Sequence, residues 1–127
     1  MVRHAEAAPG EPDDLRELTP KGFDQARALG MELAADGIRP DVVLSSPLLR
    51  ARQTAQEIAR ATGSSVEPSE RLAPGASPDD VRSAVAGRGE RVVVVGHQPD
   101  CGVVIAALTG REVAFPPAGI AAADLPS

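Results

Sequence analysis

The chain has 127 residues, of which 43% are hydrophobic and 24% charged, and its formal net charge is −5. These values are typical of one soluble globular domain rather than of a disordered or membrane-embedded chain. There is no Trp or Tyr and there are two Phe, so aromatic platforms for stacked bases are lacking, and the negative charge disfavours contact with a phosphate backbone. We therefore expect no nucleic-acid partner.

Cysteine usage and apolar runs indicate the compartment. A single Cys excludes an internal disulfide and a cysteine-based zinc site, which favours a reducing environment. The N-terminus lacks the apolar core of a signal peptide, and the longest apolar stretch, Gly102 to Leu108, is far shorter than the roughly 20 residues of a membrane-spanning helix. We expect a cytoplasmic protein without a membrane partner, and the sequence does not indicate its oligomeric state.

In chain order, the first predicted elements are a loop rich in Pro, Gly and acidic residues, Ala5 to Asp14, and a helix from Thr19-Pro20 to Gly37. A hydroxyl residue followed by Pro suits the start of a helix, and Gly suits its end. A continuously apolar run of strand length follows at Asp41 to Ser45. The next hydroxyl–Pro pair, Ser46-Pro47, predicts a helix that ends at Gly63.

The second half of the chain alternates strand and helix in the same way. Its strongest strand pattern is Arg91 to Val95, in which four consecutive valines follow an arginine. Asp100 is expected to cap the helix that comes after this strand. The other predicted elements are a strand at Ser64 to Glu67, a loop at Glu67 to Ser77, helices from Ser77-Pro78 to about Gly87 and from about Cys101 to Leu108, and a weak strand at Gly119 to Leu125.

Unbroken apolar strands lack the alternation of a sheet with one wet face, so helices should cover both faces. Strands that alternate with helices favour parallel pairing. We predict a single α/β domain over residues 1–127, with a mostly parallel central sheet flanked by helices in three α/β/α layers. Only Met1 and Val2 are left to form the first strand, so this strand and the C-terminal element are expected to be very short or trimmed.

Ligands of an open α/β sheet bind outside the carboxyl ends of its strands. Arg3 and His4 follow the first strand, Arg50 lies in the first turn of the helix after the second, and His97 follows the valine strand. Both His of the chain and two of its Arg therefore fall at one predicted edge. Two imidazoles and two guanidinium groups favour binding of a phosphoryl group, and the start of the helix at Ser46-Pro47 would add backbone N–H donors.

Three segments in this order resemble the motifs of the histidine phosphatase (phosphoglycerate-mutase-like) superfamily. They are Arg3-His4-Ala5-Glu6, the run from Ser46 to Ala55, and Gly96-His97-Gln98-Pro99. The small size, the compact loops and the segment Leu18 to Gly22 look most like the bacterial SixA-type phosphohistidine phosphatases. Ala5 departs from the Gly of the family motif. The resemblance implies the phosphoglycerate-mutase-like version of the α/β/α fold.

The resemblance also implies a covalent mechanism without metal or cofactor. His4 would be the nucleophile and would attack phosphorus as a neutral imidazole. Arg3, Arg50 and His97 would bind the phosphoryl oxygens and stabilise the charge that is transferred. Glu70 lies in roughly the region where related phosphoesterases keep a carboxylate that protonates the leaving group, so it would be the proton donor.

These roles imply a phosphohistidine phosphatase that acts on a signalling protein. An imidazole leaving group, whose conjugate acid has a pKa of about 6.5, needs a proton donor less than an alkoxide does. Two alternatives stay open: a phosphatase of small phosphoesters or nucleotides, and a non-catalytic module that binds phosphorylated groups. The expected partner is accordingly a phosphoprotein or a small phosphorylated molecule.

Other polar residues near the motifs have simpler predicted roles. Thr54 is expected to pack with its hydroxyl bonded to nearby backbone, and Ser45 and Ser46 to mark a strand end and a helix cap. The pair Asp13-Asp14 is expected to be solvated. No role follows for Glu6.

Overall fold

The computed structural model describes residues 1–125 and contains one parallel sheet. The predicted domain, 1–127, extends to residues 126 and 127, which lie outside the described part. The strands are β1 (Val2–Arg3), β2 (Val42–Ser45), β3 (Val66–Pro68) and β4 (Val92–Gly96). Their order across the sheet is β1-β4-β2-β3, and each neighbouring pair is parallel. The predicted parallel sheet is confirmed.

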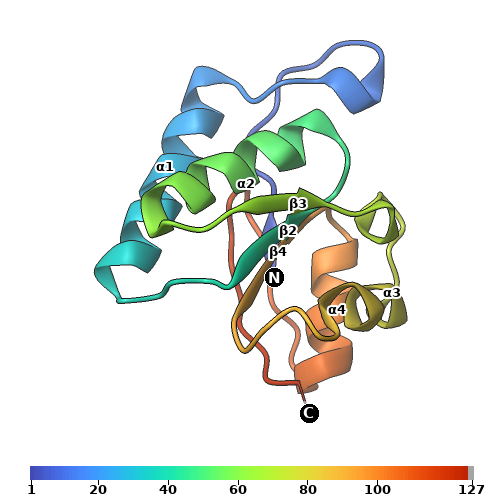
Figure 1. Cartoon of the computed structure of the whole chain (residues 1–127). Coiled ribbons are helices and arrows are strands. Elements are labelled where there is room, and N and C mark those ends of the chain that lie inside the picture. Colours follow the sequence, from blue (N-terminus) through green and yellow to red (C-terminus); the bar gives the residue numbers. More distant parts are fainter. Residues whose placement is uncertain (126–127) are drawn as a thin grey trace.

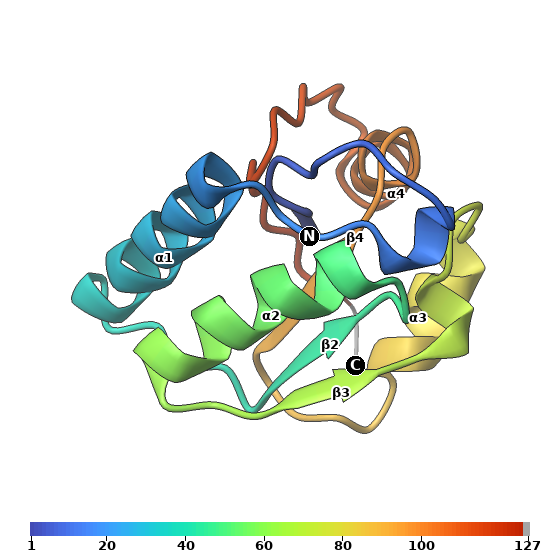
Figure 2. The same cartoon turned by 90° about the horizontal axis from the view of Figure 1, so that it is seen from above.

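Helices cover both faces of this sheet (Figures 1 and 2). The helices are α1 (Pro20–Ala35), α2 (Leu49–Thr62), α3 (Pro78–Val85) and α4 (Asp100–Thr109). Val43 of β2 packs in one apolar cluster with α1 and α2, whereas its neighbours Val42 and Leu44 pack in another with α3 and α4. Successive strand residues point to opposite faces, so a continuously apolar strand is buried on both. The three-layer architecture is confirmed. Within residues 1–125 no helix is long and apolar enough to cross a membrane.

Two of the predicted helix starts are confirmed in detail. The Thr19 side chain accepts a hydrogen bond from the Gly22 amide at the start of α1. Ser77 and Asp80 form a reciprocal capping box at the start of α3, with Pro in the first position. Each cap satisfies amide groups that have no partner inside the helix.

The other two predicted caps are wrong. Helix α2 begins at Leu49 rather than at Ser46-Pro47, because the Ser46 amide still bonds to the Val95 carbonyl across the sheet at 2.9 Å. At α4, Pro99 occupies the cap position and the Asp100 side chain makes no cap. Its carboxylate instead accepts a hydrogen bond from the Gly75 amide, at 2.7 Å, in the loop before α3.

The two ends of the described chain lie side by side at the edge of the sheet. Strand β1 is two residues long and pairs with Val95 and Gly96 of β4. Beyond it, the predicted strand Gly119 to Leu125 forms only an isolated antiparallel bridge, between Ile120 and Val2. A two-residue strand offers so few backbone partners that the segment outside it cannot extend into a regular ladder.

Candidate active site

The topology brings the sequence-predicted residues Arg3, His4, Arg50 and His97 to the carboxyl edge of the sheet. His4 follows β1, and its amide donates to the Gly96 carbonyl at the end of β4, at 2.9 Å. His97 comes next in the chain after Gly96, and the centroids of the two imidazole rings are 5.2 Å apart at 58°. Arg50 lies in the first turn of α2, and its charge acts on both rings.

Hydrogen bonding selects one tautomer of His4. Its Nδ1 lies 2.7 Å from the Ala5 carbonyl oxygen, which can only accept, so Nδ1 carries the proton. Nε2 therefore keeps its lone pair, and it has no hydrogen-bond partner among the described residues. Burial lowers the pKa of His4, and the charges of Arg50 and Arg3 add to this effect against the opposing bond to Ala5. At neutral pH the side chain is a neutral imidazole, the form that can act as a nucleophile.

The backbone that holds His4 is tied to helix α2. Ala5 is fully buried against Leu18 and Ala26, which gives its methyl group an apolar site where the family motif has Gly. The Ala5 amide donates to the Thr54 hydroxyl at 3.0 Å, and that hydroxyl donates to the Arg50 carbonyl at 2.9 Å. The predicted packing role of Thr54 is confirmed, and its hydroxyl also links the backbone of His4 to that of Arg50.

His97 has a partner that the sequence did not indicate. Its Nε2 lies 2.7 Å from the Ser46 hydroxyl, which can donate or accept and therefore suits either tautomer. The residue is only 5% exposed. Burial, followed by the charges of His4 and Arg50, lowers the pKa of His97 to about 4. His97 is therefore also neutral at neutral pH.

Buried polar atoms without partners gather at this edge. Arg50 donates from both terminal nitrogens to Asp13, and Arg3 donates from one of them to the Phe115 carbonyl at 2.9 Å. Five buried polar side-chain atoms in residues 1–125 lack a hydrogen bond: Nε of Arg3, Arg50 and Arg52, Nδ1 of His97 and the Ser45 hydroxyl. Such atoms are rare and costly. Three of the five belong to predicted phosphate ligands, and two of these, Nε of Arg3 and of Arg50, are hydrogen-bond donors without an acceptor in residues 1–125.

Asp13 and Arg16 are site neighbours that the sequence interpretation missed. Asp13 lies in a short 3-10 turn, η1 (Asp13–Leu15), and its carboxylate accepts from Arg16 at 3.0 Å and from Arg50 at 3.3 Å. The hydrogen bond from Arg16, and then the Arg50 charge, hold the pKa of Asp13 below its usual value. Arg16 also donates to the Ala8 carbonyl. The acidic loop directly after the Arg-His pair was the signal available in the sequence.

Glu70, the predicted proton donor, follows β3 at the same edge in the 3-10 turn η2 (Glu70–Leu72). The adjacent Ser69 amide bonds to the Ser45 carbonyl at 2.8 Å, which fixes the start of this turn beside β2. The Glu70 side chain is exposed and makes no hydrogen bond or ion pair with the described residues. Among the described residues, Asp13 is the one whose carboxylate contacts one of the four site residues, Arg50.

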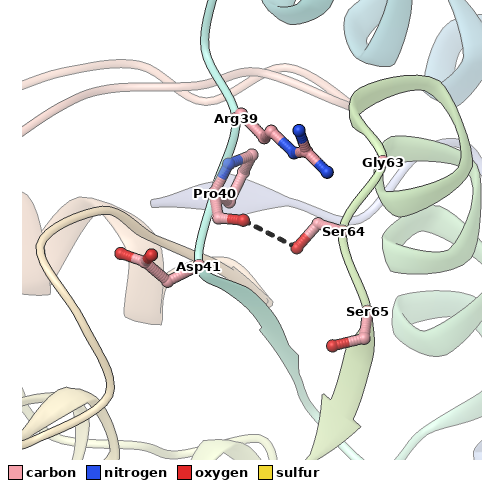
Figure 3. A pocket seen from close by; sticks show the side chains of 6 residues that line it. All are labelled: Arg39, Pro40, Asp41, Gly63, Ser64 and Ser65. Carbon is pink, nitrogen blue, oxygen red and sulfur yellow. Dashed lines mark hydrogen bonds between the residues drawn. The ribbon is translucent and has the colours of Figure 1, made fainter.

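Two cavities lie elsewhere. One, of about 460 Å³, is lined by Arg39, Pro40, Asp41, Gly63, Ser64 and Ser65 (Figure 3). The other, of about 370 Å³, lies between Met1, the start of β4 and residues 120–124. Both flank the amino ends of strands, and the first adjoins the C-terminal end of α2, where the helix dipole disfavours anions. The candidate site is therefore defined by converging side chains. Among residues 1–125 no three His, Cys, Asp or Glu side chains cluster as metal ligands.

Comparison with known proteins identifies the family. The model of the histidine phosphatase superfamily (branch 1) matches residues 1–74, more than half of the chain. The chain belongs to the histidine phosphatase superfamily. It is 36% identical over 117 residues to an uncharacterized protein of Picosynechococcus sp. PCC 7002, and the matched region covers 85% of this chain and 71% of that protein. It is 32% identical over 119 residues to phosphohistidine phosphatase SixA of Escherichia coli K12, covering 88% and 74% respectively.

Solved structures agree with this assignment. The structure of the protein histidine phosphatase SixA complexed with tungstate superimposes with a TM-score of 0.82 at 28% identity, over 92% of this chain and 81% of that one. The predicted phosphoglycerate-mutase-like fold is confirmed. As a member of this superfamily with SixA phosphatases among its relatives, the chain is a phosphatase, a hydrolase of phosphoester or phosphoramidate bonds.

Proposed function

We propose that this chain removes the phosphoryl group from phosphohistidine on a signalling protein, through a phosphohistidine intermediate on its own His4. The observation that carries the proposal is the state of His4. Its Nδ1 is held by the Ala5 carbonyl, its Nε2 is without a partner among the described residues, and its pKa is lowered. Similarity to SixA supports the same substrate class.

In the first step, His4 Nε2 attacks the phosphorus of the substrate in line with the bond that breaks. The substrate ring carries a proton from solvent on its other nitrogen. When the phosphorus–nitrogen bond breaks, its electron pair goes to this ring, which leaves as neutral imidazole. Arg3, Arg50 and His97 would donate to the non-bridging oxygens. Stabilising this charge is the main contribution of a protein to phosphoryl transfer, and the positive charge of the two guanidinium groups makes a metal or cofactor unnecessary.

In the second step, water attacks the phosphorus on His4. The Nε2–phosphorus bond breaks, its electron pair returns to the ring, and inorganic phosphate leaves while the surplus proton passes to solvent. The bond from Nδ1 to Ala5 is retained throughout, so the ring keeps its orientation and is ready for the next substrate. Residues 1–127 would act in this proposal as one catalytic domain.

The leaving group explains why phosphohistidine is preferred to a phosphoester in this proposal. Asp13 is held as a carboxylate by Arg16 and Arg50, which makes it a poor acid, and Glu70 is exposed without a partner in the described chain. An alkoxide leaving group would need a strong proton donor, whereas imidazole, with a pKa of about 6.5, leaves without one. We therefore assign no proton donor, and the role of Glu70 stays a prediction.

The test compares two substrates at equal concentration: a protein carrying phosphohistidine and a simple alkyl phosphate monoester. We expect kcat/KM to favour phosphohistidine, and we expect trapping in acid-free denaturant to reveal a phosphoryl group on the wild-type chain that is acid-labile and absent from His4→Ala. A wide preference for the monoester would instead support the phosphoester or nucleotide alternative. Binding without turnover of either substrate would support a non-catalytic module.

A further inference from the structure

The loop that follows His4 places Asp13 against Arg50. The two terminal nitrogens of Arg50 donate to the Asp13 carbonyl, at 2.8 Å, and to the Asp13 carboxylate, at 3.3 Å. We propose that Asp13 is an internal ligand of Arg50 that competes with the incoming phosphoryl group, and that it sets the affinity of the site for oxyanions. This inference rests on the proposed function, because it requires Arg50 to bind phosphoryl oxygens.

The competition follows from the geometry of a guanidinium group. Carboxylates and phosphoryl groups both bind it through paired oxygens on neighbouring N–H donors. In Arg50 both terminal nitrogens face Asp13, and Nε is enclosed without a partner in the described chain. The Asp13 carboxylate therefore occupies the terminal nitrogen Nη2, and an oxyanion that binds Arg50 through this nitrogen competes with the carboxylate.

The Asp13 carboxylate is held loosely enough to give way. Its side chain is 64% exposed, whereas that of Arg50 is 8% exposed, and the distance between them is at the long end for a hydrogen bond. Water competes for the exposed Asp13 carboxylate, so its ion pair contributes less stability than a fully buried one would. The carboxylate would keep its second partner, Arg16 at 3.0 Å, after it leaves Arg50. Displacement therefore leaves the carboxylate charged and paired.

The Asp13 carboxylate also compensates the charge of Arg50. A nearly buried guanidinium without an anion is costly, and the Asp13 carboxylate compensates its charge until a ligand arrives. The same negative charge lies beside the bound oxyanion and weakens its binding by repulsion. Both effects act in the same direction, so removal of the charge at Asp13 should tighten oxyanion binding.

The test measures binding of tungstate to the purified chain by calorimetry. The variants are Asp13→Asn, which removes the charge but keeps an oxygen for Arg16, and Asp14→Asn as the matched control. Asp14 is the exposed neighbour and makes no hydrogen bond or ion pair with the described residues. We expect Asp13→Asn to bind tungstate about fivefold more tightly than wild type, as for one unit charge about 4 Å away in water. Asp14→Asn should stay within about twofold, since its charge is farther away and screened.

A crystal structure with tungstate provides the second readout, and it is independent of how the variants fold. We expect Arg50 to donate to the oxyanion and the Asp13 carboxylate to lie beyond hydrogen-bond distance of Arg50. Equal affinities of Asp13→Asn and Asp14→Asn, or an intact Asp13–Arg50 contact beside bound tungstate, would overturn the inference and leave the proposed function standing. Tungstate binding that survives Arg50→Ala in full, or no binding by any form, would overturn both.

Discussion

The Ser46 hydroxyl lies 2.7 Å from His97 Nε2, although the two residues are 51 positions apart in the chain. Ser46 comes directly after β2 and His97 directly after β4, which are neighbouring parallel strands. The Ser46 amide is bonded to the Val95 carbonyl, so the backbone of Ser46 is fixed to the strand that carries His97. The orientation of the His97 ring is therefore set by a side chain from the adjacent strand end.

This contact predicts the effect of replacing Ser46 by Ala. His97 would lose the only hydrogen bond that its ring makes in the described chain, and its orientation toward the phosphoryl group would become less defined. We expect kcat to fall about 10- to 100-fold, by analogy with the loss of a partner that orients a metal-binding histidine. Ser45→Ala is the matched control, because the Ser45 hydroxyl is equally buried and has no partner in residues 1–125. Similar losses in both variants would refute the positioning role of Ser46.

Arg50 should not tolerate Lys. A guanidinium group offers paired donors to two phosphoryl oxygens, whereas an ammonium group acts as a single point charge. We expect Arg50→Lys to lower kcat/KM about 100-fold, in the range known for removal of one transition-state donor. Arg60→Lys is the control on the same helix, because Arg60 is exposed and pairs only with Glu57 among the described residues. Steady-state kinetics of the two variants decide the point, and near-normal activity of Arg50→Lys would contradict the assignment.

Chelation should leave the activity unchanged. Arg3 and Arg50 supply the positive charge that a divalent metal would bring to the transferring group in the proposed mechanism. We expect the same kcat/KM before and after exhaustive treatment with EDTA, and no gain when Mg²⁺, Mn²⁺ or Zn²⁺ is added back. A loss of activity that added metal restores would show that the proposed mechanism is incomplete.

The depressed pKa of His97 makes stability depend on pH. In the unfolded chain the pKa of a His is about 6.5, whereas burial lowers the pKa of His97 to about 4 in the folded protein. Between these values the unfolded state binds more protons, so the free energy of unfolding rises with pH and is lost as the pH falls from about 6.5 toward 4. The pKa of His4 is lowered in the same direction and adds to the slope.

Denaturant unfolding at several pH values measures this slope, and His97→Gln provides the comparison. The variant should be less stable at neutral pH but should lose less stability than wild type between about pH 6.5 and 4, because one of the two contributing groups is gone. Parallel curves for the two proteins would contradict the lowered pKa, because they would show that His97 takes up its proton equally well in the folded and the unfolded state.

The layered fold was predictable because its signals are local. Continuous apolar runs marked β2 and β4, and hydroxyl–Pro pairs marked the starts of α1 and α3. The convergence of Arg3, His4, Arg50 and His97 followed from topology, since parallel strands end at the same edge of the sheet. Each of these inferences needed only a short window of sequence and one general rule.

The misses arise where a contact distant in sequence overrides a local pattern. Ser46-Pro47 has the composition of a helix start, but Ser46 is held by β4 and His97 instead. Asp13 looked like a solvated loop residue, and its bonds to Arg50 depend on the path by which the loop returns to the sheet. The Asp100 carboxylate accepts a hydrogen bond from the Gly75 amide, 25 positions away, and does not cap α4. Contacts between residues so far apart in sequence cannot be predicted from the periodicity of a single segment.

Gly22 links the helix start to the backbone that follows His4, and it gives the sharpest stability prediction. It lies in the first turn of α1, where its missing side chain leaves room for the Glu6 carbonyl. A Cβ at this position would lie far inside van der Waals contact of that oxygen. The carbonyl cannot easily move away, because it also accepts a hydrogen bond from the Thr19 amide at 3.0 Å.

In an ordinary helix position, Gly→Ala stabilises by up to about 1 kcal/mol. For Gly22→Ala we expect a loss of about 2 kcal/mol or more, because a backbone clash in a packed site forces a shift of the chain. The control is Gly102→Ala in α4, where the nearest atom to a new Cβ is the end of the flexible Gln98 side chain at 3.6 Å. Gly102→Ala should be neutral or stabilising in the same unfolding measurement. Since Glu6 is two residues from His4, Gly22→Ala should also lower kcat, whereas full activity with normal stability would show that the loop can move without cost.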